Sequence, residues 1–211
     1  MNTNDHDPMH ASVVCVIDDD SAMRDSMKAL LGSVDIRAET FSSIAEFMTF
    51  TMPDAPACLI LDVRLKGQSG LAAQQQIAQN KQIPIIFVTG HGDVEMSVTA
   101  LKAGAVDFIE KPFRAQRLLD SVAGALAMDH ARRQSERWSR SLHNKYHSLT
   151  SREREVMTRV AGGLLNKQIA AEMSLSEITV KIHRRHAMQK MDSRSFADFV
   201  IKAAALGLNS I

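Results

Sequence analysis

The sequence predicts an α/β domain, built on a five-stranded parallel sheet with helices on both faces, followed by a small all-α domain. Up to Pro112, five short apolar segments alternate with stretches of helical periodicity. These segments are apolar at consecutive positions, which is typical of strands buried on both faces of a parallel sheet. Beyond Pro112 the periodicity is helical only. We therefore expect a doubly wound domain and then a helical one.

The elements of the first domain are expected in a regular alternation of strand and helix. Val13–Ile17 is the first strand, and Ser21 is expected to cap the helix that follows it. The second strand lies at 36–41, and its helix begins at about Ser43. The remaining strands are expected at 58–61, 85–88 and 105–109, and the remaining helices at 69–79, 94–103 and around 118–126.

Three segments make up the chain in this interpretation: a first domain at 12–128, a linker at 129–147 and a helical domain at 148–211. The linker is expected to be helical at first, because it contains no Gly or Pro. In the last domain, helices at 166–173 and 177–191 are joined by a tight turn, and a final helix runs from Ser193 to about Leu206.

The net charge of +1 conceals two opposite parts. Residues 1–128 hold 10 Lys and Arg against 16 Asp and Glu, whereas residues 129–211 hold 15 against 8. An acidic part joined to a basic part is typical of a regulator attached to a nucleic-acid binder.

Composition excludes several classes of protein. No apolar run approaches the roughly 18 residues of a membrane helix, and the polar N-terminus has no stretch suited to a secretion signal. Cys15 and Cys58 lie in apolar runs and fit neither a disulfide framework nor a zinc site. We expect a soluble, cytoplasmic protein without a membrane partner.

Polar residues follow four of the five predicted strands. Asp18, Asp19 and Asp20 follow the first, Asp62 the third, Thr89 the fourth and Lys111 the last. In a parallel sheet these ends share one edge, where ligands bind. Crowded carboxylates repel one another unless a cation is bound, and Mg²⁺ prefers a few carboxylate oxygens.

This residue set suits phosphoryl chemistry. Asp62, alone at its strand end, is the natural nucleophile, since a carboxylate can form an aspartyl-phosphate. Thr89 and Lys111 are suited to hold phosphoryl oxygens. Simple solvation of strand ends accounts for any one of these residues, but poorly for all of them at four strand ends.

The helix at 177–191 has two distinct faces. At about 100° per residue, one side collects Lys181, Ile182, Arg185, Met188 and Gln189, a set suited to base edges in a major groove. Val180, His183, Ala187 and Met191 fall on the core side, where His183 is a packing residue or a phosphate donor. Arg184 at the border and Thr179 near the start are expected to contact phosphates. A merely solvated basic face is the alternative.

Four segments resemble the receiver domain of two-component response regulators: Val16–Asp20, Leu61–Arg64, Val88–Asp93 and Asp107–Phe113. The resemblance implies a flavodoxin-like fold in which Asp62 accepts phosphate from a sensor histidine kinase. It implies that Asp19 and Asp62 bind Mg²⁺ directly, with Asp18 acting through water and the backbone carbonyl of Arg64 as a further ligand.

The same resemblance implies a switch pair, Thr89 and Phe108, and a cis peptide bond between Lys111 and Pro112. Two residues depart from the family pattern. Lys66 and Glu95 stand where proline is usual. Because neither touches a reacting atom, we expect them to affect the rigidity of their loops and the lifetime of the phosphate, and not the chemistry.

In the second domain, Leu149–Met157, Gly163–Ala170 and Thr179–Arg184 resemble a LuxR-type helix-turn-helix. With the receiver in front, residues 12 to 208 resemble the FixJ/NarL class of response regulators. This implies a phosphorylation-dependent transcription regulator that dimerises and binds promoter DNA through helix 177–191, contacting RNA polymerase if it is an activator. The class implies that Lys181, Ile182 and Arg185 face the bases. It implies that part of the last helix packs on the core and part pairs two copies on DNA, and packing on the core alone is the alternative for this helix.

Two other functions are compatible with part of the sequence. A haloacid-dehalogenase type phosphatase also uses a strand-end aspartate, and Asp18-x-Asp20 superficially fits it, but no later acidic pair follows Lys111. We therefore expect no enzyme beyond Mg²⁺-dependent self-phosphorylation from a phosphodonor. In the second alternative the chain still binds DNA, but its receiver is a dimerisation module that works without phosphate. The receiver retains Asp19, Asp62, Thr89 and Lys111, so the sequence gives no reason to prefer this alternative.

Overall fold

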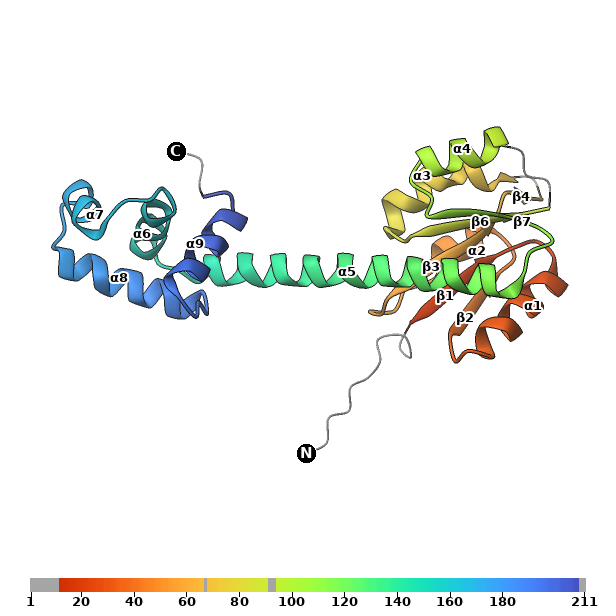
Figure 1. Cartoon of the computed structure of the whole chain (residues 1–211), viewed down its shortest axis with the longest axis horizontal. Coiled ribbons are helices and arrows are strands. Elements are labelled where there is room, and N and C mark those ends of the chain that lie inside the picture. The colour runs from red at the N-terminus through yellow and green to blue at the C-terminus, as the bar shows by residue number, and fades with distance from the viewer. Residues whose placement is uncertain (1–11, 67, 91–93, 209–211) are drawn as a thin grey trace, which may run out of the picture. The chain divides into compact units, whose positions relative to one another are not determined.

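The structure is a computed structural model that describes residues 12–66, 68–90 and 94–208. The chain divides into two compact units, Met1–Gln134 and Ser135–Ile211 (Figure 1). Each has its own hydrophobic core.

A five-stranded parallel sheet forms the centre of the first unit, with the strand order β2-β1-β3-β6-β7 (Figure 1). This order confirms the predicted doubly wound, flavodoxin-like fold. A short antiparallel pair, β4 (Arg64–Leu65) and β5 (Gln68–Ser69), follows β3 and was not predicted. The strands of the sheet are β1 (Val13–Ile17), β2 (Arg37–Phe41), β3 (Ala57–Asp62), β6 (Ile85–Thr89) and β7 (Asp107–Glu110).

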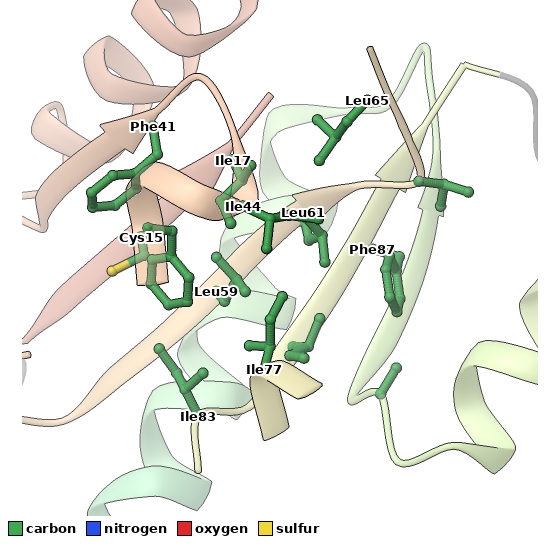
Figure 2. Close-up of a cluster of buried hydrophobic side chains, with 14 of the residues drawn as sticks. Cys15, Ile17, Phe41, Ile44, Leu59, Leu61, Leu65, Ile77, Ile83 and Phe87 are labelled. Atoms are coloured by element: carbon green, nitrogen blue, oxygen red, sulfur yellow. The ribbon is translucent and has the colours of Figure 1, made fainter. Parts of the chain in front are cut away.

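Helices cover both faces of this sheet. The helices that begin in this unit are α1 (Ser21–Gly32), α2 (Ile44–Thr49), α3 (Gly70–Lys81), α4 (Val94–Lys102) and α5 (Ala115–His147). Alternate residues of β1 point to opposite sides: Cys15 packs in the layer with α2, α3 and α4, and Val16 in the layer with α1 and α5. Figure 2 shows the first of these layers, in which Ile44 and Ile77 approach Leu59 and Leu61.

Two helix starts differ from the prediction. Asp20, not Ser21, caps α1: its carboxylate accepts a 2.9 Å hydrogen bond from the N–H of Ala22. The last helix, α9 (Phe196–Ala205), begins three residues later than expected, because the Ser195 hydroxyl caps it by accepting from Asp198 N–H.

Helix α5 contains 33 residues and extends from the first unit into the second. Leu118 and Val122 pack on the sheet, and Leu142 belongs to the core of the second unit. The segment 129–147 is thus helical throughout, while the limits of 12–128, 129–147 and 148–211 remain predictions. Among the described residues, no helix is both long and apolar enough to cross a membrane.

Helices α6 (Ser151–Ala161), α7 (Asn166–Met173), α8 (Glu177–Lys190) and α9 pack together with the end of α5 to form the second unit. A capping box starts α6, in which Thr150 and Glu153 satisfy each other's backbone N–H groups. Ser174 adopts a left-handed conformation, with φ of 54°, in the turn between α7 and α8. The all-α prediction for this part of the chain is confirmed.

Candidate functional site

The structure brings together Asp18, Asp62 and Lys111 at one edge of the sheet. The Lys111 Nζ atom lies 2.8 Å from Asp18 Oδ2 and 2.9 Å from Asp62 Oδ2. Both carboxylates are buried. One ammonium group therefore bridges the ends of β1 and β3, as parallel strands allow.

Backbone groups fix the other oxygen of each carboxylate. The N–H of Asp20 donates to Asp18 Oδ1, and the N–H of Arg64 donates to Asp62 Oδ1, both at 2.9 Å. Lys111 is held in turn, since its own N–H donates to the Thr89 carbonyl at 2.8 Å. The charged groups are thus oriented before any ligand arrives.

Two opposing effects act on the pKa of Lys111. Burial lowers the pKa of its ammonium, but the hydrogen bonds and charges of Asp18 and Asp62 outweigh burial and raise the pKa above its ordinary value. The side chain is therefore a permanent cation at neutral pH.

The pocket suits Mg²⁺ by its donor chemistry. Among the described residues, no three His, Cys, Asp or Glu side chains are arranged to hold a metal by themselves. Mg²⁺ does not require this, because it binds through one or two carboxylates and keeps several waters. Two ammonium groups lie beside the acidic side chains of this pocket. Lys111 Nζ contacts Asp18 and Asp62, and Lys66 Nζ lies 3.7 Å from Asp19 Oδ2.

The expected switch residues lie on neighbouring strands. Thr89 is buried at the end of β6, and Phe108 lies on β7, where it pairs in register with Phe87. The rings of Phe87 and Phe108 are 6.3 Å apart. The predicted cis peptide bond between Lys111 and Pro112 is confirmed, and Glu95 lies in the first turn of α4.

Sequence reasoning missed Gly70, the first residue of α3. A Cβ atom at this position would overlap the backbone carbonyl oxygen of Asp62, and the Gly70 N–H donates to the Val63 carbonyl at 2.9 Å. The signal available was a glycine at the start of a predicted helix, where its low helix propensity needs another reason.

The structure divides the residues expected to contact DNA into two groups. Arg184 is half-buried and contacts neighbouring helices, with Nη1 3.1 Å from Asn166 Oδ1 and its guanidinium 5.5 Å from the Phe196 ring centre. The Thr179 hydroxyl lies 2.8 Å from Ser176 Oγ at the helix start, and His183 is half-buried.

The remaining four face outward. Lys181, Ile182, Arg185 and Gln189 are exposed, and Lys181 Nζ lies 3.1 Å from Glu177 Oε1. Val180 and Ala187 are fully buried, as the periodicity predicts for the core face. The prediction is wrong for Met188, which was expected on the outer face but packs against the hydrophobic core of the unit.

Two family models match the chain. Residues 14–123 match the response regulator receiver domain, and residues 147–203 match the luxR family of bacterial regulatory proteins. The chain belongs to the two-component response regulators. Members with this pair of domains are phosphorylation-dependent DNA-binding transcription regulators, and not classical enzymes. Their receiver domains take phosphate from histidine kinases, and their helix-turn-helix domains bind DNA.

Relatives of this response regulator match it over both domains. Nodulation protein W of Bradyrhizobium diazoefficiens is 49% identical over 94% of this chain and 88% of that protein. The transcriptional regulatory protein FixJ of the same organism is 37% identical over 92% and 96%. The solved structure of the response regulator StyR has a TM-score of 0.83 at 41% identity, covering 92% of this chain and 98% of that one. The resemblance drawn from the motifs is thereby confirmed.

Proposed function

We propose that Asp62 is the phosphoacceptor of this response regulator, and that its phosphorylation makes the chain dimerise and bind promoter DNA. The observation that carries the proposal is the position of Lys111 Nζ, between the carboxylates of Asp18 and Asp62. A cation that spans two strand ends is placed to neutralise a phosphoryl group bonded to one of them.

In the proposed transfer, a carboxylate oxygen of Asp62 attacks the phosphorus of a phosphohistidine on a sensor kinase. An O–P bond forms as the P–N bond breaks, and the electron pair of that bond stays on the histidine nitrogen. Lys111 and the Thr89 hydroxyl hold the phosphoryl oxygens. The N–H of Arg64 and the ammonium of Lys111, each hydrogen-bonded to one Asp62 oxygen, orient this carboxylate for the attack.

Bound Mg²⁺ would neutralise the negative charge that the phosphoryl group adds to the pocket. In this proposal Asp19, Asp62 and the backbone carbonyl of Arg64 ligate the ion directly, and Asp18 does so through water. Hard oxygen donors in an acidic pocket support the assignment.

We propose that Thr89 and Phe108 relay phosphorylation to the α4 and β7 face, so that a homodimer forms. Two copies then bind two half-sites, with Lys181, Ile182, Arg185 and Gln189 of each α8 at base edges. We propose that Thr179, His183 and Arg184 contact the DNA phosphates. If the protein is an activator, the bound dimer would also contact RNA polymerase.

Sedimentation velocity tests this proposal. We expect wild-type protein with Mg²⁺ to change from monomer to dimer when acetyl phosphate is added, and we expect the Asp62→Asn variant to remain a monomer. An Asp62→Asn protein that dimerises like wild type would contradict the assignment of the phosphoacceptor. Loss of the wild-type response after Mg²⁺ is removed with a chelator would support the metal assignment.

A further inference from the structure

The outward face of α8 carries a residue that the base-contact assignment leaves out. At about 100° per residue, Ile178 lies between Arg185 and Gln189 in angle, within about 40° of Ile182. The four side chains form one stripe along the helix. Ile178 therefore occupies the middle of the face that the proposed function directs at the bases, one turn before Ile182.

Folding of the second unit does not explain this isoleucine. Its side chain is 70% exposed and that of Ile182 is 48% exposed, and neither belongs to the hydrophobic core of the unit. Isoleucine also has a lower helix propensity than alanine, lysine or glutamate. Single exposed apolar residues are ordinary, but two in line with Arg185 and Gln189 place apolar surface where a ligand is expected.

We propose that Ile178, together with Ile182, reads the 5-methyl groups of thymines in the target half-site. This inference rests on the proposed function, in which α8 lies in the major groove. The thymine methyl is the apolar group that a base pair presents there, and apolar side chains recognise it by contact. The neighbouring Lys181 and Arg185 supply the positive charge that a duplex requires.

The spacing of the two isoleucines fits base pairs that lie two steps apart. Four residues of helix advance about 6 Å along the axis, and two base-pair steps advance about 6.8 Å. The pair therefore matches thymine methyls about two steps apart, while Arg185 and Gln189 lie further along the same stripe, at positions suited to guanine and adenine.

Removal of individual methyl groups from DNA tests the inference. Full-length protein treated with Mg²⁺ and acetyl phosphate is used to select a duplex from a random library. Each thymine of that duplex is then replaced by deoxyuridine, which lacks the 5-methyl group, and affinity is measured by fluorescence anisotropy. We expect one or two replacements per half-site to weaken binding about fourfold each, the effect of exposing roughly one buried methyl group.

The Ile178→Ala variant identifies the side chain that makes the contact. We expect Ile178→Ala to bind equally well with thymine or deoxyuridine at one of the sensitive positions, while the other replacement still weakens its binding. We expect Ile182→Ala to show the reverse pattern. Leu165→Ala is the matched control, since Leu165 is 71% exposed in the same unit but lies next to α7, and it should keep both. Circular dichroism checks that each variant is folded.

Three outcomes would overturn the inference. Binding that is equally tight with thymine and deoxyuridine at every position excludes methyl recognition while leaving the proposed function intact. An Ile178→Ala variant that weakens binding equally to all duplexes, or that alters only self-association in sedimentation, assigns the residue to the fold or to a second copy of the chain. Wild-type protein that selects no duplex from the library would contradict the proposed function itself.

Discussion

Gly70 packs directly against the backbone carbonyl of Asp62, so the end of β3 that carries the proposed phosphoacceptor rests on a residue without a side chain. A methyl group there would displace the Asp62 backbone. We expect Gly70→Ala to lower the free energy of unfolding by about 1–3 kcal/mol and to slow phosphorylation by acetyl phosphate, followed on Phos-tag gels. Gly124→Ala is the control, because a Cβ at Gly124 meets open space within α5 and should stabilise the protein slightly. Equal phosphorylation rates in both variants would contradict this packing role.

We expect the ammonium group of Lys66 to compete with Mg²⁺ for the carboxylate of Asp19. Its side chain is 87% exposed, with Nζ 3.7 Å from Asp19 Oδ2. Since exposed ion pairs are weak, we expect Lys66→Ala to tighten Mg²⁺ binding by only about two- to fivefold, measured by titration calorimetry, and less at high salt. Lys28→Ala, which removes an exposed charge from α1, should leave the Mg²⁺ affinity unchanged. Weaker binding by the Lys66 variant would oppose the account.

Asp129 fastens α5 to the sheet. Its carboxylate, 1% exposed, accepts hydrogen bonds from Ala57 N–H at 2.9 Å, Arg132 Nη2 at 2.6 Å and Arg133 Nε at 2.7 Å. We expect Asp129→Ala to cost about 2–3 kcal/mol in urea unfolding, less than a fully buried pair because both arginines are partly exposed. Asp54→Ala removes the exposed partner of Arg133 and should cost under about 1 kcal/mol. Similar losses in the two variants would count against this role.

Stability of the second unit should fall in acid because of Glu153. Burial raises the pKa of Glu153, but hydrogen bonds from Lys190 and Thr150 outweigh burial and hold it below the ordinary 4.5. A lowered pKa means that ionisation favours folding: this contribution is complete above pH 4.5 and is lost as pH falls through the lower, folded pKa.

The measurement is urea unfolding followed by the fluorescence of Trp138, the single tryptophan of the sequence. Between pH 6 and about pH 3, we expect wild type to lose more stability than Glu153→Gln, whose side chain cannot ionise. Glu155→Gln, which removes an exposed carboxylate from the same helix, should follow wild type. If the stability of wild type and that of Glu153→Gln fell equally with pH, the result would contradict this role of Glu153.

We expect alanine substitutions of two neighbouring arginines of α8, Arg184 and Arg185, to change DNA binding in different ways. Arg185 is exposed on the base-facing stripe, so Arg185→Ala should relax base preference at one position, at a cost of about 1–3 kcal/mol for the preferred base. Arg184 is held by Asn166 and Phe196, so Arg184→Ala should mainly lower the melting temperature and weaken binding to all duplexes alike. Affinities for all single-base variants of a selected duplex separate the two, and a uniform loss from Arg185→Ala would refute its assignment.

The features predicted well depend on local sequence signals. Apolar runs such as Val13–Ile17 determine the strands, and in a parallel sheet the order of the strands brings their polar ends, Asp18, Asp62 and Lys111, to one edge. The core face of α8 follows likewise from the positions of Val180 and Ala187.

The features that were missed depend on contacts between residues far apart in sequence. Asp129 is buried where it accepts a hydrogen bond from the N–H of Ala57, and half-buried Arg184 contacts Asn166 and Phe196, which lie on other helices. The capping of α1 by Asp20 instead of Ser21 reflects a competition between adjacent acceptors that composition cannot decide.

The most direct test of the central claim measures DNA affinity of full-length wild type and Asp62→Asn on one selected duplex, with Mg²⁺ and with or without acetyl phosphate. We predict that the phosphodonor tightens binding by wild type, that it leaves Asp62→Asn unchanged, and that mass spectrometry locates the added phosphoryl group on Asp62. Equal tightening in both proteins, or none in a wild type that carries phosphate on Asp62, would contradict a switch operated through Asp62.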